Sequence, residues 1–217
     1  MVIGARLRWF AAIGGLLVAL AVLTTVELVA PPRIADTAVL DLMVTHRTPG
    51  WTAIATAVTN SGASPFTYPL IVLAGLLTGM RTRRWQPGVA ALCIVVLGVL
   101  SRLLLSVLVG DGRPPLEQRL VAVQGFSFPS GHAASSALLA GALIWLAGRA
   151  LLPYPVRWTT AAVLVPWAFL VGVSRLYLGV HWISDVVGSW LLAGAWLCVL
   201  PLLDSTSSPT RIEGGAG

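Results

Sequence analysis

Ser174–Asp185 reads S-R-L-Y-L-G-V-H-W-I-S-D, and apolar runs adjoin it at Val156–Ser174 and His181–Leu203. An earlier stretch, Pro129–His132, reads P-S-G-H and opens another long apolar run. Ionisable side chains at the edge of a membrane span are costly unless they are paired or hydrated. An arginine, two histidines and an aspartate in these places therefore indicate a functional centre built into a membrane protein.

The composition is that of a polytopic membrane protein. Of the 217 residues, 57% are hydrophobic and only 10% are charged, whereas soluble domains carry about 25% charged residues. The net charge of +6 comes entirely from arginine, because the chain contains no lysine. These arginines stand singly or beside apolar runs rather than in a basic stripe, so we expect no nucleic-acid binding.

Six apolar runs approach the roughly 20 residues that a membrane-spanning helix needs, which predicts an all-α bundle of six transmembrane helices. They are Leu7–Ala30, Pro65–Met80, Pro87–Val109, His132–Leu152, Val156–Ser174 and His181–Leu203. The less apolar segment Trp51–Ser61 predicts a short interfacial helix before the second span. We therefore expect one membrane domain, residues 1–204, followed by a disordered cytoplasmic tail at 205–217 that is rich in Ser, Thr and Gly.

Arginine placement predicts the orientation, since cytoplasmic loops carry the excess of basic residues. One side of the six-span arrangement holds eight arginines and the other holds five. The larger group is Arg6, Arg8, Arg81, Arg83, Arg84, Arg149, Arg157 and Arg211, and the smaller is Arg33, Arg47, Arg113, Arg119 and Arg175. Both termini are then cytoplasmic, and the motif-bearing loops lie on the extracytoplasmic face of the plasma membrane.

The first run could alternatively be a cleaved signal peptide. Arg6 and Arg8 precede an apolar stretch that contains Ala19-Leu20-Ala21, which suits a cleavage site. The apolar run continues past that site and is long enough to span a bilayer. We therefore favour a retained first span.

The residues of the motifs have defined chemical uses. Ser130 is a candidate N-cap, and Gly131 permits close backbone approach at a helix N-terminus, where exposed amides attract anions. His132 lies in that first turn. His181 and Asp185 are four residues apart at the start of the last span, so we expect them on one helix face, where the carboxylate can orient the imidazole ring.

Two arginines accompany these residues. Arg175 precedes His181 by six residues, and Arg113-Pro114 lies in the loop after the third expected span. The guanidinium fork matches the geometry of phosphate oxygens. Snorkelling explains a lone arginine at a membrane edge, but it does not explain a neighbouring His–Asp pair. Together the residues indicate a phosphate-handling site.

The order and spacing of these motifs resemble the three-part signature of the type 2 phosphatidic acid phosphatase superfamily. Arg113-Pro114 matches the first part and Pro129–His132 the second, and Ser174-Arg175 followed by His181 and Asp185 matches the third. The six-span layout also resembles the membrane branch of that family. The resemblance therefore covers nearly the whole chain.

One position departs from the family pattern. The first motif of the family usually has a lysine seven residues before its arginine, and Ser106 stands there in this chain. Arg102 lies one helical turn before Ser106 on the same face. We therefore expect Arg102 to supply the missing cation.

The resemblance implies a phosphatase that acts through a phosphohistidine. His181 would be the nucleophile, Asp185 would orient it and His132 would protonate the leaving group. Phosphate binding would fall to Arg113, Arg175, Ser130, Gly131 and Arg102. The resemblance implies no cofactor and no metal ion, and no Asp-rich cluster of the kind that holds Mg²⁺ occurs in the sequence.

The expected substrate is a lipid phosphate in the outer leaflet. Polyprenyl phosphates or diphosphates and glycerophospholipid phosphates are the candidates, and the resemblance with the outward-facing site slightly favours a polyprenyl diphosphate. Two alternatives stay open: phosphotransfer from the same phosphohistidine to a lipid or sugar hydroxyl, and a non-enzymatic lipid transporter with a polar gate. The transporter is disfavoured because transport does not require a nucleophile with its orienting carboxylate and proton donor. The oligomeric state is not predicted.

Overall fold

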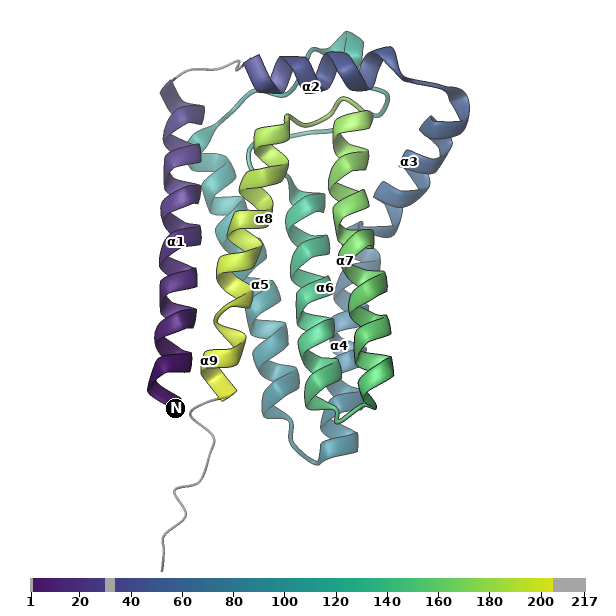
Figure 1. Ribbon diagram of the computed structural model, residues 1–217. Coiled ribbons are helices and arrows are strands. Elements are labelled where there is room, and N and C mark those ends of the chain that lie inside the picture. Colours follow the sequence, from purple (N-terminus) through teal and green to yellow (C-terminus); the bar gives the residue numbers. More distant parts are fainter. Residues whose placement is uncertain (1, 30–33, 205–217) are drawn as a thin grey trace, which may run out of the picture.

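Long helices form a bundle whose upper end is crossed by a shorter helix (Figure 1). The computed structural model describes residues 2–29 and 34–204, so the tail expected at 205–217 lies outside the described residues. Within the described ranges all regular elements are helical, which confirms the all-α expectation. They are α1 Val2–Val29, α2 Ile34–Thr45, α3 Pro49–Ser61, α4 Ser64–Thr82, α5 Gln86–Val109, the 3-10 turn η1 Leu116–Gln118, α6 Gly131–Arg149, α7 Tyr154–Tyr177, α8 Ile183–Leu197 and α9 Leu200–Asp204.

Five stretches are long and apolar enough to cross a membrane. They are α1, α5, α6, α7 and the stretch Ile183–Leu203, which comprises α8 and α9. The last expected span is therefore divided, because α8 ends at Leu197 and α9 begins at Leu200. The second expected span corresponds to α4, which packs against α5 and α6. That α4 also crosses the bilayer stays a prediction.

Two short helices, rather than one, precede α4. The helix expected at Trp51–Ser61 is α3, which packs against α7. The sequence pattern does not predict α2, which lies across the end of the bundle (Figure 1). The buried Asp36 of α2 accepts a hydrogen bond from the backbone N–H of Ser184, 3.1 Å away in the first turn of α8. This bond ties α2 to the start of α8. The interfacial position of α3 stays a prediction.

The central helix of the bundle is α6, which packs against α4, α5, α7 and α8. Many of its buried residues are small, and small side chains let helices approach one another closely. They include Ala133, Ala134, Ser135, Ser136, Ala140 and Ala142. The start of α6 at Gly131 is consequently enclosed by neighbouring helices near the α2 end.

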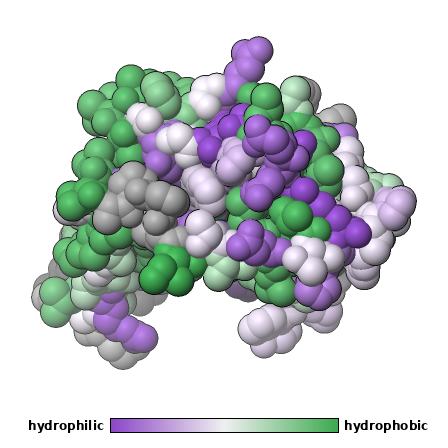
Figure 2. All heavy atoms as spheres, turned by 90° about the horizontal axis from the view of Figure 1, so that it is seen from above, coloured by the Kyte–Doolittle hydropathy of each residue, from purple (hydrophilic) through white to green (hydrophobic). Residues whose placement is uncertain are grey.

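Three connections meet at the α2 end. Arg47, between α2 and α3, donates hydrogen bonds to the backbone oxygen of Tyr177 at 3.0 and 3.1 Å and to that of Gln118 at 2.8 Å. These bonds join the α2–α3 connection to the end of α7 and to the loop between α5 and α6. Figure 2, which views this end, shows hydrophilic residues gathered over the middle of the face and hydrophobic residues mainly toward its left side.

The contact between α4 and α5 generates a prediction about packing. A Cβ atom on Gly88 would lie 2.8 Å from the backbone oxygen of Gly75 and 2.9 Å from its Cα atom. Backbone atoms of packed helices cannot move aside easily, so we expect Gly88→Ala to lower the free energy of unfolding by about 1–3 kcal/mol. Thermal unfolding in detergent measures the change. Gly15→Ala is the control, because a Cβ atom at Gly15 meets nothing within 4 Å; equal melting temperatures for the two variants would contradict this contact.

Candidate active site

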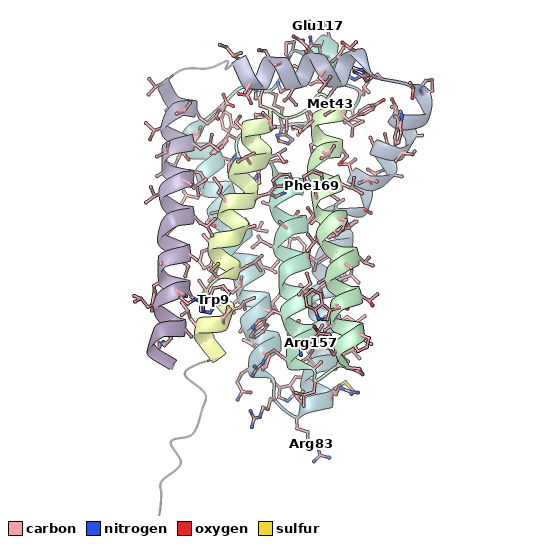
Figure 3. The ribbon with its side chains drawn as sticks, viewed as in Figure 1. Trp9, Met43, Arg83, Glu117, Arg157 and Phe169 are labelled. Carbon is pink, nitrogen blue, oxygen red and sulfur yellow. The ribbon has the colours of Figure 1, made fainter. Side chains whose placement is uncertain are left out.

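The residues selected from the sequence meet at the α2 end of the bundle. Arg102 lies on α5, Arg113 in the following loop, Ser130, Gly131 and His132 at the start of α6, Arg175 in the last turn of α7, His181 just before α8 and Asp185 in its first turn. In Figure 3, Glu117 and Met43 mark this end of the molecule, and Arg83 and Arg157 lie toward the other end.

Asp185 is completely buried and makes several contacts through one oxygen atom. Its Oδ2 accepts hydrogen bonds from the backbone N–H of Trp182 at 2.8 Å and from the Ser127 hydroxyl, and it lies 3.1 Å from His181 Nδ1. Trp182 is the N-cap of α8, so His181 precedes the helix. The expectation that His181 and Asp185 share a helix face is therefore wrong, because the carboxylate turns back to cap α8 and meets the ring there.

The contacts of His181 assign its tautomer. Its Nε2 lies 3.1 Å from Arg113 Nη1, and a guanidinium can only donate. Nε2 is therefore the unprotonated nitrogen, and Nδ1 carries the hydrogen that Asp185 accepts. Burial, and then the positive charges of Arg175, Arg113 and Arg102, lower the pKa of His181 well below its ordinary value of 6.5. A neutral ring with an unprotonated Nε2 is the form of histidine that can act as a nucleophile, once its lone pair is released from the Arg113 N–H.

Arg113 has an acceptor for each of its five N–H groups. One acceptor is His181 Nε2, and the other four are backbone carbonyl oxygens. These belong to Gln124 (3.1 Å), Gly125 (2.9 Å), Phe126 (2.9 Å) and Val180 (2.8 Å). Arg113 thus holds the loop before α6 against the loop before α8. A phosphate would have to share or displace one of these acceptors, so the expected phosphate contact of Arg113 stays a prediction.

Arg102 is less fully occupied. Its Nε donates to the backbone oxygen of Pro129 at 2.8 Å. The guanidinium lies so close to Gly131 that a Cβ atom there would be 3.3 Å from its Cζ atom. Arg102, Gly131 and His132 line a cavity of about 230 Å³ between α4, α5 and α6. Arg102 therefore has N–H groups available beside the start of α6; that it replaces the lysine that the family usually has at position 106 stays a prediction.

Among the buried polar atoms without a partner within residues 2–29 and 34–204 are two near these arginines that can donate: Nε of Arg175 and Oγ of Ser130. The Nη1 of Arg175 donates to the Thr59 hydroxyl at 2.9 Å. Ser130 occupies the N-cap position of α6 as expected, but its hydroxyl makes no capping bond. An unpaired buried donor costs roughly 1–3 kcal/mol. A bound anion at the start of α6 would offer acceptors to these groups.

Sequence reasoning missed three residues that support the site: Ser127, Thr59 and Asp36. Ser127 lies two residues before Pro129–His132, and this proximity is a signal that could have drawn attention to it. Thr59 is 116 residues away from Arg175 along the chain, and Asp36 is 148 residues away from Ser184. No sequence spacing links such pairs, because packing alone brings them together.

Comparison with known proteins gives a family and several relatives. A family model described as the PAP2 superfamily matches residues 63–208. The chain is similar to phosphatidylglycerophosphatase B of Bacillus subtilis (34% identical over 163 residues, 73% of this chain and 77% of that protein). It is also similar to an undecaprenyl-diphosphatase of Sulfolobus acidocaldarius (38% over 89 residues, 41% of this chain and 38% of that protein).

Among solved structures, the chain is similar to the crystal structure of a transmembrane PAP2 type phosphatidylglycerolphosphate phosphatase from Bacillus subtilis. The TM-score is 0.83 at 27% sequence identity, and the match covers 92% of this chain and 98% of that one. A second similar structure, Aquifex aeolicus LpxE, has a TM-score of 0.61 at 21% identity and covers 81% of this chain and 99% of that one. The likeness to LpxE concerns the fold alone.

The electrostatics of His181 generate a prediction about its protonation. We expect the ring to stay neutral, with hydrogen on Nδ1, as the pH falls below 6.5, because burial and three arginines lower its pKa. Nitrogen NMR spectra of histidine-labelled protein in detergent, recorded from about pH 8 to about pH 5, report the charge and tautomer of each ring. The His181→Ala spectrum identifies the signal. Protonation of His181 at or above pH 6.5 would show that the arginines do not act on it as described.

Proposed function

This chain belongs to the PAP2 superfamily and is a membrane lipid phosphatase, and we propose that the site at the α2 end hydrolyses a phosphomonoester or diphosphate of a membrane lipid. The arrangement of His181 carries the proposal. Its ring has an unprotonated Nε2, a carboxylate at Nδ1 and three arginines within electrostatic reach. Such a ring is poised to attack an electrophile that carries negative charge.

In the proposed reaction, His181 Nε2 forms a bond to phosphorus while the bond to the leaving oxygen breaks. Asp185 keeps the hydrogen on Nδ1 and stabilises the positive charge that develops on the ring. His132 gives a proton to the departing oxygen and then accepts one from the water that attacks the phosphohistidine. Inorganic phosphate leaves, and His181 returns to its neutral form.

In the proposed reaction, hydrogen-bond donors around His181 Nε2 bind the negatively charged oxygens of the phosphoryl group. We assign this role to Arg102, Arg175, the Ser130 hydroxyl and the Gly131 amide. Arg102 and Gly131 line the cavity at the start of α6, and Arg175 Nε and Ser130 Oγ are buried without a partner in the described residues. Arg113 bonds to Nε2 itself, so its N–H can turn to a phosphate oxygen as phosphorus approaches. Donors aimed at the equatorial oxygens act mainly on the transition state, where charge is redistributed. This set needs no metal ion.

We place the site on the extracytoplasmic face of the plasma membrane. Arginines gather at the opposite end of the bundle, where α1 begins, α4 meets α5 and α6 meets α7 (Figures 1 and 3). An excess of basic residues is typical of the cytoplasmic side. The substrate would then be a lipid of the outer leaflet, with its phosphate at the level of the α2 end.

Two lipids are the main candidate substrates. The names of similar proteins point to phosphatidylglycerophosphate and to undecaprenyl diphosphate, and each lipid carries a terminal phosphate at its headgroup. Polyprenyl diphosphate, favoured on sequence grounds, remains a candidate beside the glycerolipid. Both would place an apolar tail in the bilayer and a dianionic or more highly charged group at the arginines.

Phosphate release tests the proposal directly. Purified protein in EDTA should release inorganic phosphate from undecaprenyl diphosphate, phosphatidylglycerophosphate or phosphatidate with no added acceptor. His181→Ala should abolish release, and Asp185→Asn should lower it by several orders of magnitude, because the wrong ring tautomer is favoured. Normal turnover by His181→Ala would refute the nucleophile, dependence on an added acceptor would indicate phosphotransfer, and loss of activity in EDTA would refute metal independence.

The role of Arg102 has its own test. One donor that clamps a transition-state oxyanion can be worth about a hundredfold in turnover, so Arg102→Ala should lower kcat by about that factor. Arg102→Lys, which keeps the charge, should retain more activity. Arg84→Ala, an exposed arginine at the opposite end, is the control. If Arg102→Ala turns over as fast as the wild type, the enzyme works without this third cation.

A further inference from the structure

Another cavity lies toward the end of the bundle opposite the active site. It has a volume of about 580 Å³ and opens between α1, α6, α7, α8 and α9. Glycines at positions 141, 148 and 194 form part of its wall, where larger side chains would fill the space. Trp9 and Arg157, which border it, lie toward the end of the bundle opposite α2 (Figure 3). The proposed phosphatase reaction uses none of these residues.

Two arginines border this cavity. Arg149 is half-buried, and its guanidinium carbon lies 5.9 Å from the ring centroid of Trp145. Arg157 is exposed, and its guanidinium has no hydrogen-bond or ion-pair partner in the described part of the chain. Gly148 lies beside it, since a Cβ atom there would be 3.5 Å from Arg157 Nη2. The cavity therefore presents guanidinium groups that can bind phosphate oxygens as a fork.

The remaining walls are apolar. Leu197 of α8, Leu200 and Pro201 of α9, and Trp9 of α1 also line the cavity. Tryptophan is enriched at the level of lipid headgroups. A free inorganic anion would use the guanidinium groups but not these apolar walls. A molecule with an anionic headgroup and a hydrocarbon chain would use both.

We propose that this cavity binds an anionic glycerophospholipid from the leaflet opposite the active site. Arg149 and Arg157 hold the phosphodiester, and the upper part of an acyl chain lies against α8 and α9. Basic cavities between transmembrane helices are known sites for anionic headgroups on the cytoplasmic side. The occupant is a bound lipid and not a substrate, because a phosphodiester lacks the terminal phosphate that the proposed reaction releases.

Native mass spectrometry of the full chain in detergent tests the site. Phosphatidylglycerol should be retained as a one-to-one adduct, and phosphatidylcholine with the same acyl chains should not. One arginine beside an anionic headgroup is worth about 1 kcal/mol, or about fivefold in affinity, so Arg157→Gln should weaken binding by about that factor. Gly148→Leu should weaken binding by filling the cavity without changing the charge. Arg84→Gln makes the same charge change at the same end, outside the cavity, and should leave binding unchanged.

Several results would overturn the proposal. Equal losses in Arg157→Gln and Arg84→Gln would mean that general surface charge attracts the lipid, and equal retention of phosphatidylcholine would mean that the cavity does not select charge. If inorganic phosphate displaced phosphatidylglycerol, the lipid would be held by its phosphate alone. It would then be bound at an anion site elsewhere and not in this cavity with apolar walls. Melting temperatures confirm that each variant is folded. Native mass spectrometry measures lipid binding without turnover. A failure to retain phosphatidylglycerol can therefore be distinguished from a failure to release phosphate in the phosphatase assay.

Discussion

Asp185 joins three segments of the chain by hydrogen bonds made in complete burial. Its carboxylate accepts from Ser127 and Trp182 and holds His181, and its backbone oxygen accepts from the N–H of Ser130 at 3.2 Å. A buried carboxylate is costly unless it accepts hydrogen bonds; the donors here all reach Oδ2, and Oδ1 has no partner within the described residues. The α5–α6 loop, the start of α6 and the imidazole ring are consequently positioned by one residue of α8. Asp185 therefore positions the segments that carry the proposed phosphate-binding groups, and the arginines act within that arrangement.

The arginines at this end differ in how many of their N–H groups are already hydrogen-bonded within the protein. Arg113 uses all of its N–H groups to join two loops and to contact His181. Arg102 and Arg175 each make one side-chain hydrogen bond within the described residues, which leaves donors for a ligand. Several cations so close together repel one another, and their repulsion is relieved when an anion binds. Burial, and then the positive charge of these arginines, lower the pKa of His181, so the groups proposed to bind the substrate also favour the neutral form of the proposed nucleophile.

Long apolar runs and short motifs were sufficient to predict the helical membrane fold, because both are local properties of the chain. The same patterns did not predict α2, whose position depends on a bond from Asp36 to Ser184. They also placed His181 inside the last helix, because spacing of four residues suits a helix face. The structure instead begins α8 at Ile183 and forms the His–Asp contact through a helix cap.

Residue types and motif spacing by themselves identified which side chains belong to the candidate site, since each motif is a few residues long. They did not reveal what each side chain does there. Arg113 and Arg102 are both arginines near one end of a span, yet one is fully bonded and the other borders a cavity. Thr59 accepts from Arg175 across 116 residues of chain. Such partners are set by how helices pack, and only the tertiary structure could decide which donors remain free for a phosphate.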